Sequence, residues 1–280
     1  MKILTFDIED WYCGDNISRD MDWLKFKPRI SENVDRILNE LEIRNQKATF
    51  FCLGWLAEHF PKVIKKISDY GHEIGCHTYQ HELLTRFDRN TFDQDCYKAI
   101  SALEDTIGKK IVLFRAPAFS VTNNNLFVFE VLNKYGITTD CSIFPAYRDF
   151  GGMPNYSSSK PSIVYYNGIS LKEFPINIYK LMNKDIVYSG GGYFRLFPYW
   201  LIKKLTERSE YVMTYFHPRD FDVNQPKMPH LPKIRQIKND IGINTSFGKF
   251  QRYLDDFTFI DIETADKNID WSNVDKIFLD

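Results

Sequence analysis

The sequence predicts an α/β fold in which mostly parallel strands alternate with helices. Two observations support this fold class. Short apolar runs rich in β-branched and aromatic residues recur along the chain, and segments with apolar residues at helical spacing separate them. Repeated strand–helix units over 280 residues indicate a parallel β/α barrel or a doubly wound sheet, since both arrangements cover a parallel sheet with helices.

The first half of the chain shows this alternation most clearly. Strands are expected at 2–6, 47–53, 72–77, 111–114 and 137–143. Helices are expected at 32–43 with Ser31 as N-cap, from Pro61 to about Tyr70, from an N-cap at Thr91 to Gly108, and near 124–135 with Gly136 at the end.

A loop-rich stretch at 145–170 interrupts the pattern, which then resumes. Strands are expected at 171–176, 211–216 and 257–262, and helices near 198–208 and 246–255. No internal repeat and no clear linker divides the sequence. We therefore expect one domain over residues 1–280, with long loops after about residue 145.

Charge and composition argue against several classes of partner. Lys plus Arg number 36 and Asp plus Glu number 37, so the near-zero net charge argues against nucleic acid or an anionic membrane as the main partner. No apolar stretch approaches the roughly 18–20 residues of a membrane span, and the first residues lack the apolar core of a signal peptide. The five cysteines are scattered without CxxC spacing, which argues against a disulfide framework. We expect a reduced, cytoplasmic protein.

Candidate functional residues follow four of the expected strands. Asp7 to Asp10 come after the first strand, His77 after the third, Arg115 after the fourth, and His217 after 211–216. The carboxyl ends of parallel strands meet at one edge of a sheet or one end of a barrel, so these side chains are expected to converge.

The stretch "TFDIED" and the pair His77 and His81 have the composition of a metal site. The acidic residues Asp7, Glu9 and Asp10 could form a solvated loop or a helix cap, but a bound cation is the usual reason for holding like charges together. Two imidazoles and one carboxylate suit Zn²⁺ or a similar ion and leave positions open for water and substrate. Cys76, beside His77, should point to the opposite face of its strand and into the core.

Each of the other candidates has a structural and a catalytic interpretation. Arg115 could form a surface ion pair, or it could orient a buried carboxylate. His217 could be a core histidine, or a general acid that carries a proton near neutral pH. The run "SGGGYFRL" (189–196) lacks the signatures of a phosphate loop or a dinucleotide site, so a tight turn and a surface facing a bulky substrate both stay open. Aromatic residues make up 16% of the chain, which fits either core packing or a cleft that stacks on sugar rings.

Taken together and in this order, "TFDIED", "HTYQH", "RAPAFS" and "YFHP" resemble the polysaccharide deacetylases of the NodB-homology group, carbohydrate esterase family 4. The opening Asp-x-Glu-Asp-Trp motif is similar to that of a subgroup encoded with exopolysaccharide genes. The segments "DCSIFPAYRDFGGMP", "EFPI", "GGGYFRL" and "FHPRDFD…QPKMP" resemble later motifs of that subgroup, including a C-terminal extension at about 220–262.

The resemblance implies a distorted (β/α) barrel, a divalent metal (Zn²⁺ first) and hydrolysis of N-acetyl groups on the amino sugars of a surface glycan or its precursor. It makes Asp7 the base, His77 and His81 metal ligands, Arg115 the residue that orients the base, and His217 the acid. The metal carboxylate is expected to be Asp10, with Glu9 as the alternative because Ile8 separates Asp7 from the acids that follow.

The sequence departs from the family at Ala118, where many members carry tyrosine; a backbone N–H there could still bind an oxyanion. Two other functions stay open. One is an amidohydrolase acting on a small substrate such as a ureide, and the other is a glycan-binding protein without catalysis.

Overall fold

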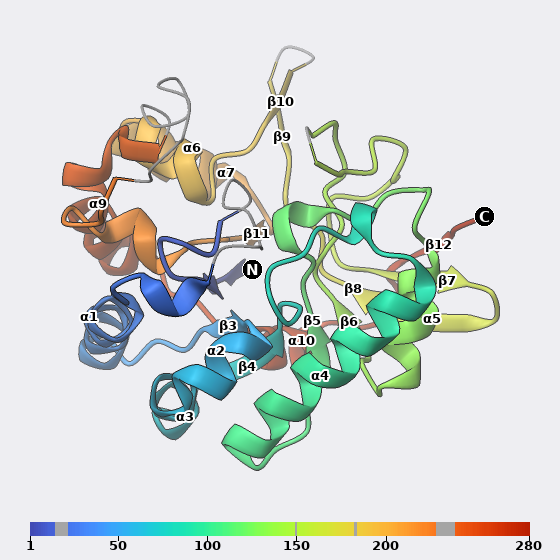
Figure 1. Ribbon diagram of the computed structural model, residues 1–280. Coiled ribbons are helices and arrows are strands. Elements are labelled where there is room, and N and C mark those ends of the chain that lie inside the picture. Colours follow the sequence, from blue (N-terminus) through green and yellow to red (C-terminus); the bar gives the residue numbers. More distant parts are fainter. Residues whose placement is uncertain (15–21, 149, 182–183, 228–238) are drawn as a thin grey trace.

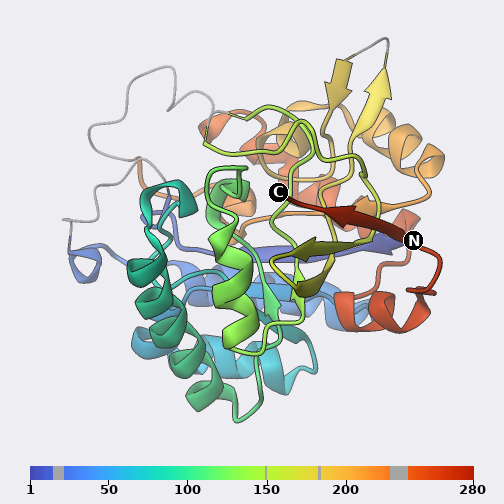
Figure 2. The same ribbon diagram turned by 90° about the vertical axis from the view of Figure 1, so that its right-hand side faces the viewer.

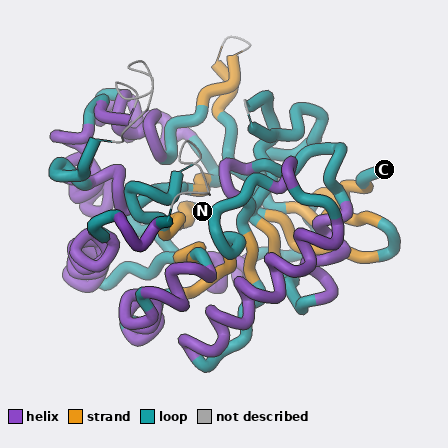
Figure 3. The backbone as a smooth tube through the Cα atoms, viewed as in Figure 1, coloured by secondary structure: helices purple, strands orange, loops and turns teal. Residues whose placement is uncertain are grey.

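The computed structural model describes residues 1–280 except 15–21, 149, 182–183 and 228–238 (Figure 1). Most of the strands lie in the middle of the molecule, with helices on the left and lower sides of the view (Figure 3). The strands are β1 (Lys2–Ile3), β2 (Thr5–Ile8), β3 (Thr49–Cys52), β4 (Glu73–Cys76), β5 (Leu113–Phe114), β6 (Thr139–Asp140), β7 (Ser162–Tyr166), β8 (Ile169–Glu173), β9 (Tyr179–Leu181), β10 (Lys184–Ile186), β11 (Val212–Met213) and β12 (Asp275–Phe278). The helices are α1 (Ile30–Ile43), α2 (Gly54–His59), α3 (Pro61–Asp69), α4 (Arg89–Ile107), α5 (Phe127–Lys134), α6 (Gly191–Leu196), α7 (Tyr199–Arg208), α9 (Ile243–Asp256) and α10 (Ile262–Asn268).

The main sheet has the strand order β12-β7-β8-β6-β5-β4-β3-β2. All neighbouring pairs are parallel except β7 and β8, which form an antiparallel pair. Beyond β2, a single bridge between Phe6 and Phe216 continues the arrangement toward β11, which pairs with β1. The predicted α/β class is therefore confirmed, although the strands of the described part of the chain do not close into a continuous barrel.

Helices pack on the outside of the sheet because each presents one apolar face to it. In α1, Val34, Ile37, Leu38 and Leu41 are buried, as their spacing predicts. Helices α4 and α5 lie side by side in both ribbon views, with β12 next to β7 at the far edge (Figures 1 and 2). The antiparallel pair β9–β10 projects from the body of the molecule.

Most of the aromatic residues build the core. Phe6 stacks on Phe50 with ring centroids 4.9 Å apart, and Phe216, Phe221 and Phe250 extend the cluster between the sheet and α9. The five cysteines are all buried as free thiols. Within the described residues, no helix combines the length and apolar character needed to cross a membrane.

Several expected helix boundaries shift, and the reasons are local. Ser31 is not the N-cap of α1, which begins after Arg29 without a cap from its own chain neighbours. For α4 the N-cap is Asp88, whose carboxylate accepts from the Thr91 N–H at 2.8 Å, so Thr91 is the third residue of a capping box. Gly108 adopts the left-handed conformation that ends this helix, as expected.

Two segments were assigned wrongly from the sequence. The supposed loop 145–170 contains all of β7, whose alternating apolar residues are hidden by the Pro, Ser and Tyr around them. The run 257–262 forms only one bridge to the sheet, at Ile260, before α10 begins. The glycine-rich run 189–196, for which the sequence left two interpretations open, contains the short helix α6.

Candidate active site

Glu9, His77 and His81 converge at the ends of β2 and β4. Glu9 follows β2 directly, His77 follows β4, and His81 lies four residues further along the same loop. The Nε2 atom of His81 is 2.9 Å from Oε1 of Glu9, and Nε2 of His77 is 3.5 Å from the same oxygen. One donor atom from each of the three residues lies within 4.8 Å of the other two, and all three side chains are buried.

The loop after β4 turns His81 back toward His77. Thr78 and His81 both have positive φ angles, 66° and 57°, which are uncommon for residues other than glycine and are typical of functional loops. The start of α2 holds this loop in place, since the N–H groups of Gly54 and Trp55 donate to the carbonyls of Thr78 and Tyr79 at 3.0 and 2.9 Å. The strained turn therefore has a rigid support.

The donor set fits a divalent cation. His77 donates from Nδ1 to the Arg115 carbonyl at 2.7 Å, which fixes the tautomer that leaves Nε2 as an acceptor. Within the described residues, Nε2 of His77 and Oε2 of Glu9 are buried without a hydrogen-bond partner. Unpaired buried acceptors of this kind are costly unless a cation or a water satisfies them. Two imidazoles and a carboxylate are also ligands that Zn²⁺ prefers.

Electrostatics favours the ionised form of Glu9. Burial by itself would raise the pKa of Glu9, but the neighbouring imidazoles of His81, His217 and His77 bring that pKa well below its usual range. The carboxylate is thus available to a cation at neutral pH.

The structure does not bring Asp10 to the histidines. Its carboxylate accepts from three backbone N–H groups, those of Trp11 at 2.8 Å, Arg29 at 2.8 Å and Ile30 at 3.0 Å. Asp10, which is distant from α1 in the sequence, therefore caps the start of this helix. The N-cap residue Arg29 itself makes no side-chain capping hydrogen bond. The geometry therefore favours Glu9, the alternative that the sequence left open, over the expected Asp10 as the carboxylate of a metal site.

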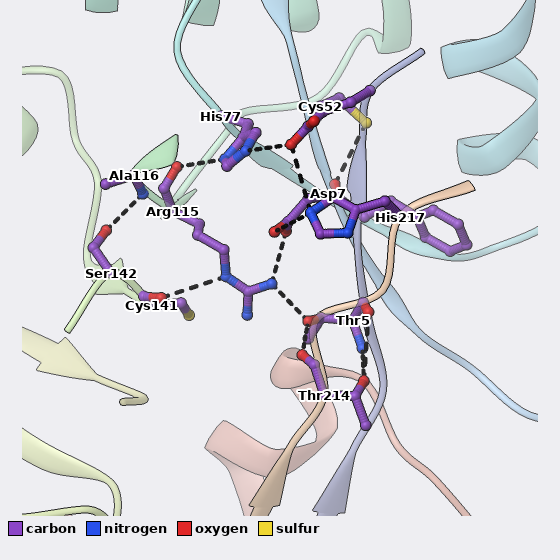
Figure 4. A network of polar contacts seen from close by, with 12 residues as sticks. Thr5, Asp7, Cys52, His77, Arg115, Ala116, Cys141, Ser142, Thr214 and His217 are labelled. Atoms are coloured by element: carbon purple, nitrogen blue, oxygen red, sulfur yellow. Dashed lines mark hydrogen bonds and ion pairs between the residues drawn. The ribbon is translucent and has the colours of Figure 1, made fainter. Parts of the chain in front are cut away.

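Arg115 and Asp7 form a buried ion pair close to His77 and His217 (Figure 4). Nη1 of Arg115 donates to Oδ1 of Asp7 at 2.8 Å and to the Thr5 hydroxyl at 2.7 Å. The guanidinium carbon lies 4.1 Å from the centroid of the Phe51 ring, and the arginine is fully buried. These contacts fit the predicted role of Arg115, which is to orient Asp7, and exclude a surface arginine.

His217 reaches the same place from the strand end after β11. Its Nε2 lies 3.9 Å from Oδ2 of Asp7 and 3.7 Å from Oε1 of Glu9. Its Nδ1 lies 3.0 Å from Oδ2 of Asp220, and Asp220 in turn pairs with Arg195 at 3.1 Å. Burial by itself would lower the pKa of His217, but the charges of Glu9 and Asp220 and the hydrogen bond to Asp220 raise it.

Asp220 is a residue that the sequence analysis did not single out. Burial alone would raise its pKa, but His217 and Arg195 bring the pKa to about 2, so the carboxylate stays ionised. The signal was present in "YFHPRDFD", where an acid three residues after a histidine at a strand end can close a capping box, as it does here. Met228 and Pro229, in the last of the motifs, lie outside the described residues.

A cavity of about 490 Å³ joins these groups to the surface. Asp7, Glu9, His81 and His217 line its floor, and the glycine-rich start of α6 forms part of its wall. Gly190 lies against the neighbouring strand so closely that a Cβ atom would be 2.3 Å from the Tyr215 carbonyl oxygen. The run 189–196 therefore faces the cavity, as one of its two interpretations held.

The comparisons with known proteins identify two matched regions in the chain. Residues 3–139 match the model of the family described as polysaccharide deacetylase, and residues 141–267 match a domain of unknown function, DUF3473. A peptidoglycan-N-acetylglucosamine deacetylase from Bacillus cereus is 36% identical over 95 residues, which are 34% of this chain and 34% of that relative. The chain thus matches about a third of that relative's length.

Solved structures show the fold at lower identity. A protein from Mycobacterium smegmatis described as a polysaccharide deacetylase superposes with a TM-score of 0.60 at 20% identity, covering 89% of this chain and 80% of the other. A pseudoenzyme of carbohydrate esterase family 4 from Bacillus anthracis superposes with a TM-score of 0.50 at 13% identity, covering 94% of this chain and 64% of the other.

The two matched regions share one structure. Strands β2 to β5 of the main sheet lie in the first region, and β7 and β8 lie in the second. Strand β6, at the boundary between the two regions, pairs with both β5 and β8. The first region holds Asp7, Glu9 and both clustered histidines, and the second supplies His217 and Asp220. The chain thus combines a polysaccharide deacetylase domain, matched over residues 3–139, with a DUF3473 region that supplies His217 and Asp220 to the candidate active site.

Proposed function

We propose that this protein is a metal-dependent hydrolase that removes N-acetyl groups from amino sugars of a surface polysaccharide or its precursor. One observation carries the proposal: the triad Glu9, His77 and His81 shares a cavity with the carboxylate of Asp7 and the imidazole of His217. Membership of the polysaccharide deacetylase family supports deacetylation as the reaction.

Glu9, His77 and His81 would hold the divalent ion, and Zn²⁺ suits this ligand set best. A bound ion of this kind supplies Lewis-acid chemistry, which polarises an acetyl carbonyl and lowers the pKa of water. The Arg115 carbonyl orients His77 for this role through the hydrogen bond at Nδ1.

Asp7 is placed to accept the proton of the attacking water. Its Oδ1 is held by Arg115, whereas its Oδ2 lies 3.9 Å from Nε2 of His217. At this separation one atom of the water or the substrate can lie within hydrogen-bond distance of both groups. Because the guanidinium of Arg115 balances the charge of Asp7 and fixes its orientation, the base needs no rearrangement before it reacts.

His217 is placed to protonate the departing nitrogen. An amide nitrogen leaves poorly as an anion, so proton donation is required for the C–N bond to break. Asp220 holds Nδ1 of the ring and directs Nε2 toward Asp7 and Glu9, and the raised pKa of His217 favours the protonated form. The products are acetate and a free amino sugar.

The test is acetate release from N-acetylated oligosaccharides by metal-loaded protein. Chelated protein and an Asp7→Asn variant serve as controls, and both should release little acetate. Turnover of ureides without acetate release from any amino sugar would replace the proposal with a small-substrate amidohydrolase. Glycan binding with no turnover by the metal-loaded protein would replace it with a binding protein, a possible outcome given the fold it shares with a pseudoenzyme.

A further inference from the structure

A second cavity adjoins the candidate active site. It has a volume of about 460 Å³ and shares three lining residues, Ala118, Arg148 and Tyr193, with the cavity that holds Asp7 and His217. Tyr193, which is 49% exposed, and Arg148 therefore stand at the boundary between the two spaces. A substrate longer than one sugar would pass this boundary.

Arg148 is held in place by aromatic rings rather than by an acid. Its guanidinium carbon lies 4.7 Å from the centroid of Phe144 and 5.4 Å from that of Phe119. Its Nη1 atom is buried and makes no hydrogen bond within the described residues. Asp185 also lines the second cavity but is exposed, and no ion pair joins it to Arg148 in the described structure.

The backbone around Arg148 is anchored to the turn beside the active site. Arg148 forms a bridge with Gly151, and the Gly152 N–H donates to the Phe119 carbonyl at 3.2 Å. Gly152 has a φ of 90°, and a Cβ atom there would lie 2.3 Å from the Ala146 carbonyl oxygen. Only glycine therefore allows the backbone at residue 152 to approach Ala146 this closely. The position of the guanidinium relative to the catalytic cavity is thus set by the fold.

A buried guanidinium N–H without an acceptor is unfavourable, since leaving such a donor unpaired costs about 1–3 kcal/mol and more for a charged group. The planar fork of arginine matches carboxylate and phosphate groups in particular, and stacking on rings fixes its plane without using its donors. Arg148 therefore has the properties of a binding site for an anionic group of the substrate.

We propose that Arg148 binds an anionic group, a carboxylate or a phosphate, on the unit joined to the N-acetylated sugar. The inference rests on the proposed function, because it places the reacting sugar in the cavity of Asp7 and His217 and the anionic unit in the second cavity. The substrate class is then an acidic glycan or a sugar phosphate precursor rather than a neutral polymer. Tyr193 lies between the two units and offers its ring to either sugar.

The first test measures binding by titration calorimetry, so that it does not depend on turnover. Three probes are compared: a disaccharide of glucuronic acid and N-acetylglucosamine, UDP-N-acetylglucosamine, and the neutral dimer of N-acetylglucosamine. At least one anionic probe should bind about tenfold or more tightly than the neutral dimer, as expected for one charge-assisted pair. Tighter binding of the glucuronic acid disaccharide would indicate a carboxylate as the natural group, and tighter binding of UDP-N-acetylglucosamine would indicate a phosphate.

Variants of Arg148 assign the preference to this side chain. Arg148→Gln should remove the preference for the anionic probe while leaving binding of the neutral dimer unchanged, and Arg148→Lys should keep part of it. Arg208→Gln, which removes an exposed arginine at the end of α7, is the matched control and should keep all of it. Circular dichroism checks that each variant is folded.

Kinetics supplies the second readout. In Arg148→Gln the KM for the anionic substrate should rise about tenfold with little change in kcat, because the arginine binds a group remote from the reacting amide. Equal binding of all three probes by the unmodified protein, or an equal loss for all probes in Arg148→Gln, would overturn the inference. Binding that depends on Arg148 without acetate release from any probe would support this site and refute the proposed function.

Discussion

Replacing Asp10 with alanine should destabilise the protein without reducing its binding of the proposed metal ion. The carboxylate of Asp10 accepts from the N–H groups of Trp11, Arg29 and Ile30, and the Trp11 and Ile30 contacts are buried. In Asp10→Ala these donors lose their acceptor. A buried donor left unpaired costs about 1–3 kcal/mol, and the loss of a helix cap costs about 0.5–2 kcal/mol.

The two buried donors, the N–H groups of Trp11 and Ile30, account for most of the expected loss in free energy of unfolding. Water can reach Arg29 at the partly exposed start of α1, so the expected loss is about 3 kcal/mol, a large share of the roughly 5–15 kcal/mol that holds a domain together. Asp10→Asn should lose only about 1 kcal/mol, since the amide oxygen can still accept from Arg29 and Ile30 while its NH₂ group faces the Trp11 N–H.

Urea denaturation followed by circular dichroism at pH 7 measures the free energy of unfolding, and mass spectrometry of the native protein measures bound zinc. Asp10→Ala should unfold at lower urea and, where folded, hold as much zinc as the unmodified protein. An Asp10→Ala protein with unchanged stability and no zinc would refute this reasoning, because it would make Asp10 a ligand.

Three further outcomes follow from the same contacts. Asp220→Asn should lower kcat about 10- to 100-fold with unchanged zinc content, because His217 loses the partner that orients it; unchanged kcat would contradict this role. Arg115→Met should lower the free energy of unfolding, measured in urea at pH 7, by about 3–5 kcal/mol, because the Asp7 carboxylate is left buried without its cation. A loss under 1 kcal/mol would contradict this expectation. Burial raises the pKa of Glu73 from its ordinary 4.5 to about 7, which penalises the charged form in the folded state. The unfolding free energy should therefore fall as the pH rises from about 4.5 to 7, and the Glu73→Gln protein should show a smaller fall; identical pH profiles would contradict the raised pKa.

The convergence of the candidate site followed from the strand pattern. Each polar motif came directly after an apolar run, and the ends of parallel strands lie at one edge of the sheet, so Asp7, His77, Arg115 and His217 meet as expected. The sheet itself was also predictable, because fully buried strands such as β3 are continuous apolar runs in the sequence.

The choice between Glu9 and Asp10 could not be made from sequence. Both follow β2 within two residues. Only the position of α1, whose first residue Ile30 lies 20 residues after Asp10, shows what Asp10 binds. Asp220 was missed because its role depends on a turn that lets it reach back to His217. Arg148 was missed because its environment is created by Phe119 and Phe144, which lie in separate parts of the sequence.

The most direct test of the account is the zinc content and acetate release of Glu9→Gln measured beside Asp10→Asn. Glutamine keeps the size of Glu9 but removes the charge that balances a divalent cation. We expect Glu9→Gln to fold, to lose most of its bound zinc and to release no acetate, whereas Asp10→Asn keeps its zinc and most of its activity. Full zinc binding by Glu9→Gln, with loss of zinc in Asp10→Asn, would contradict the site described above.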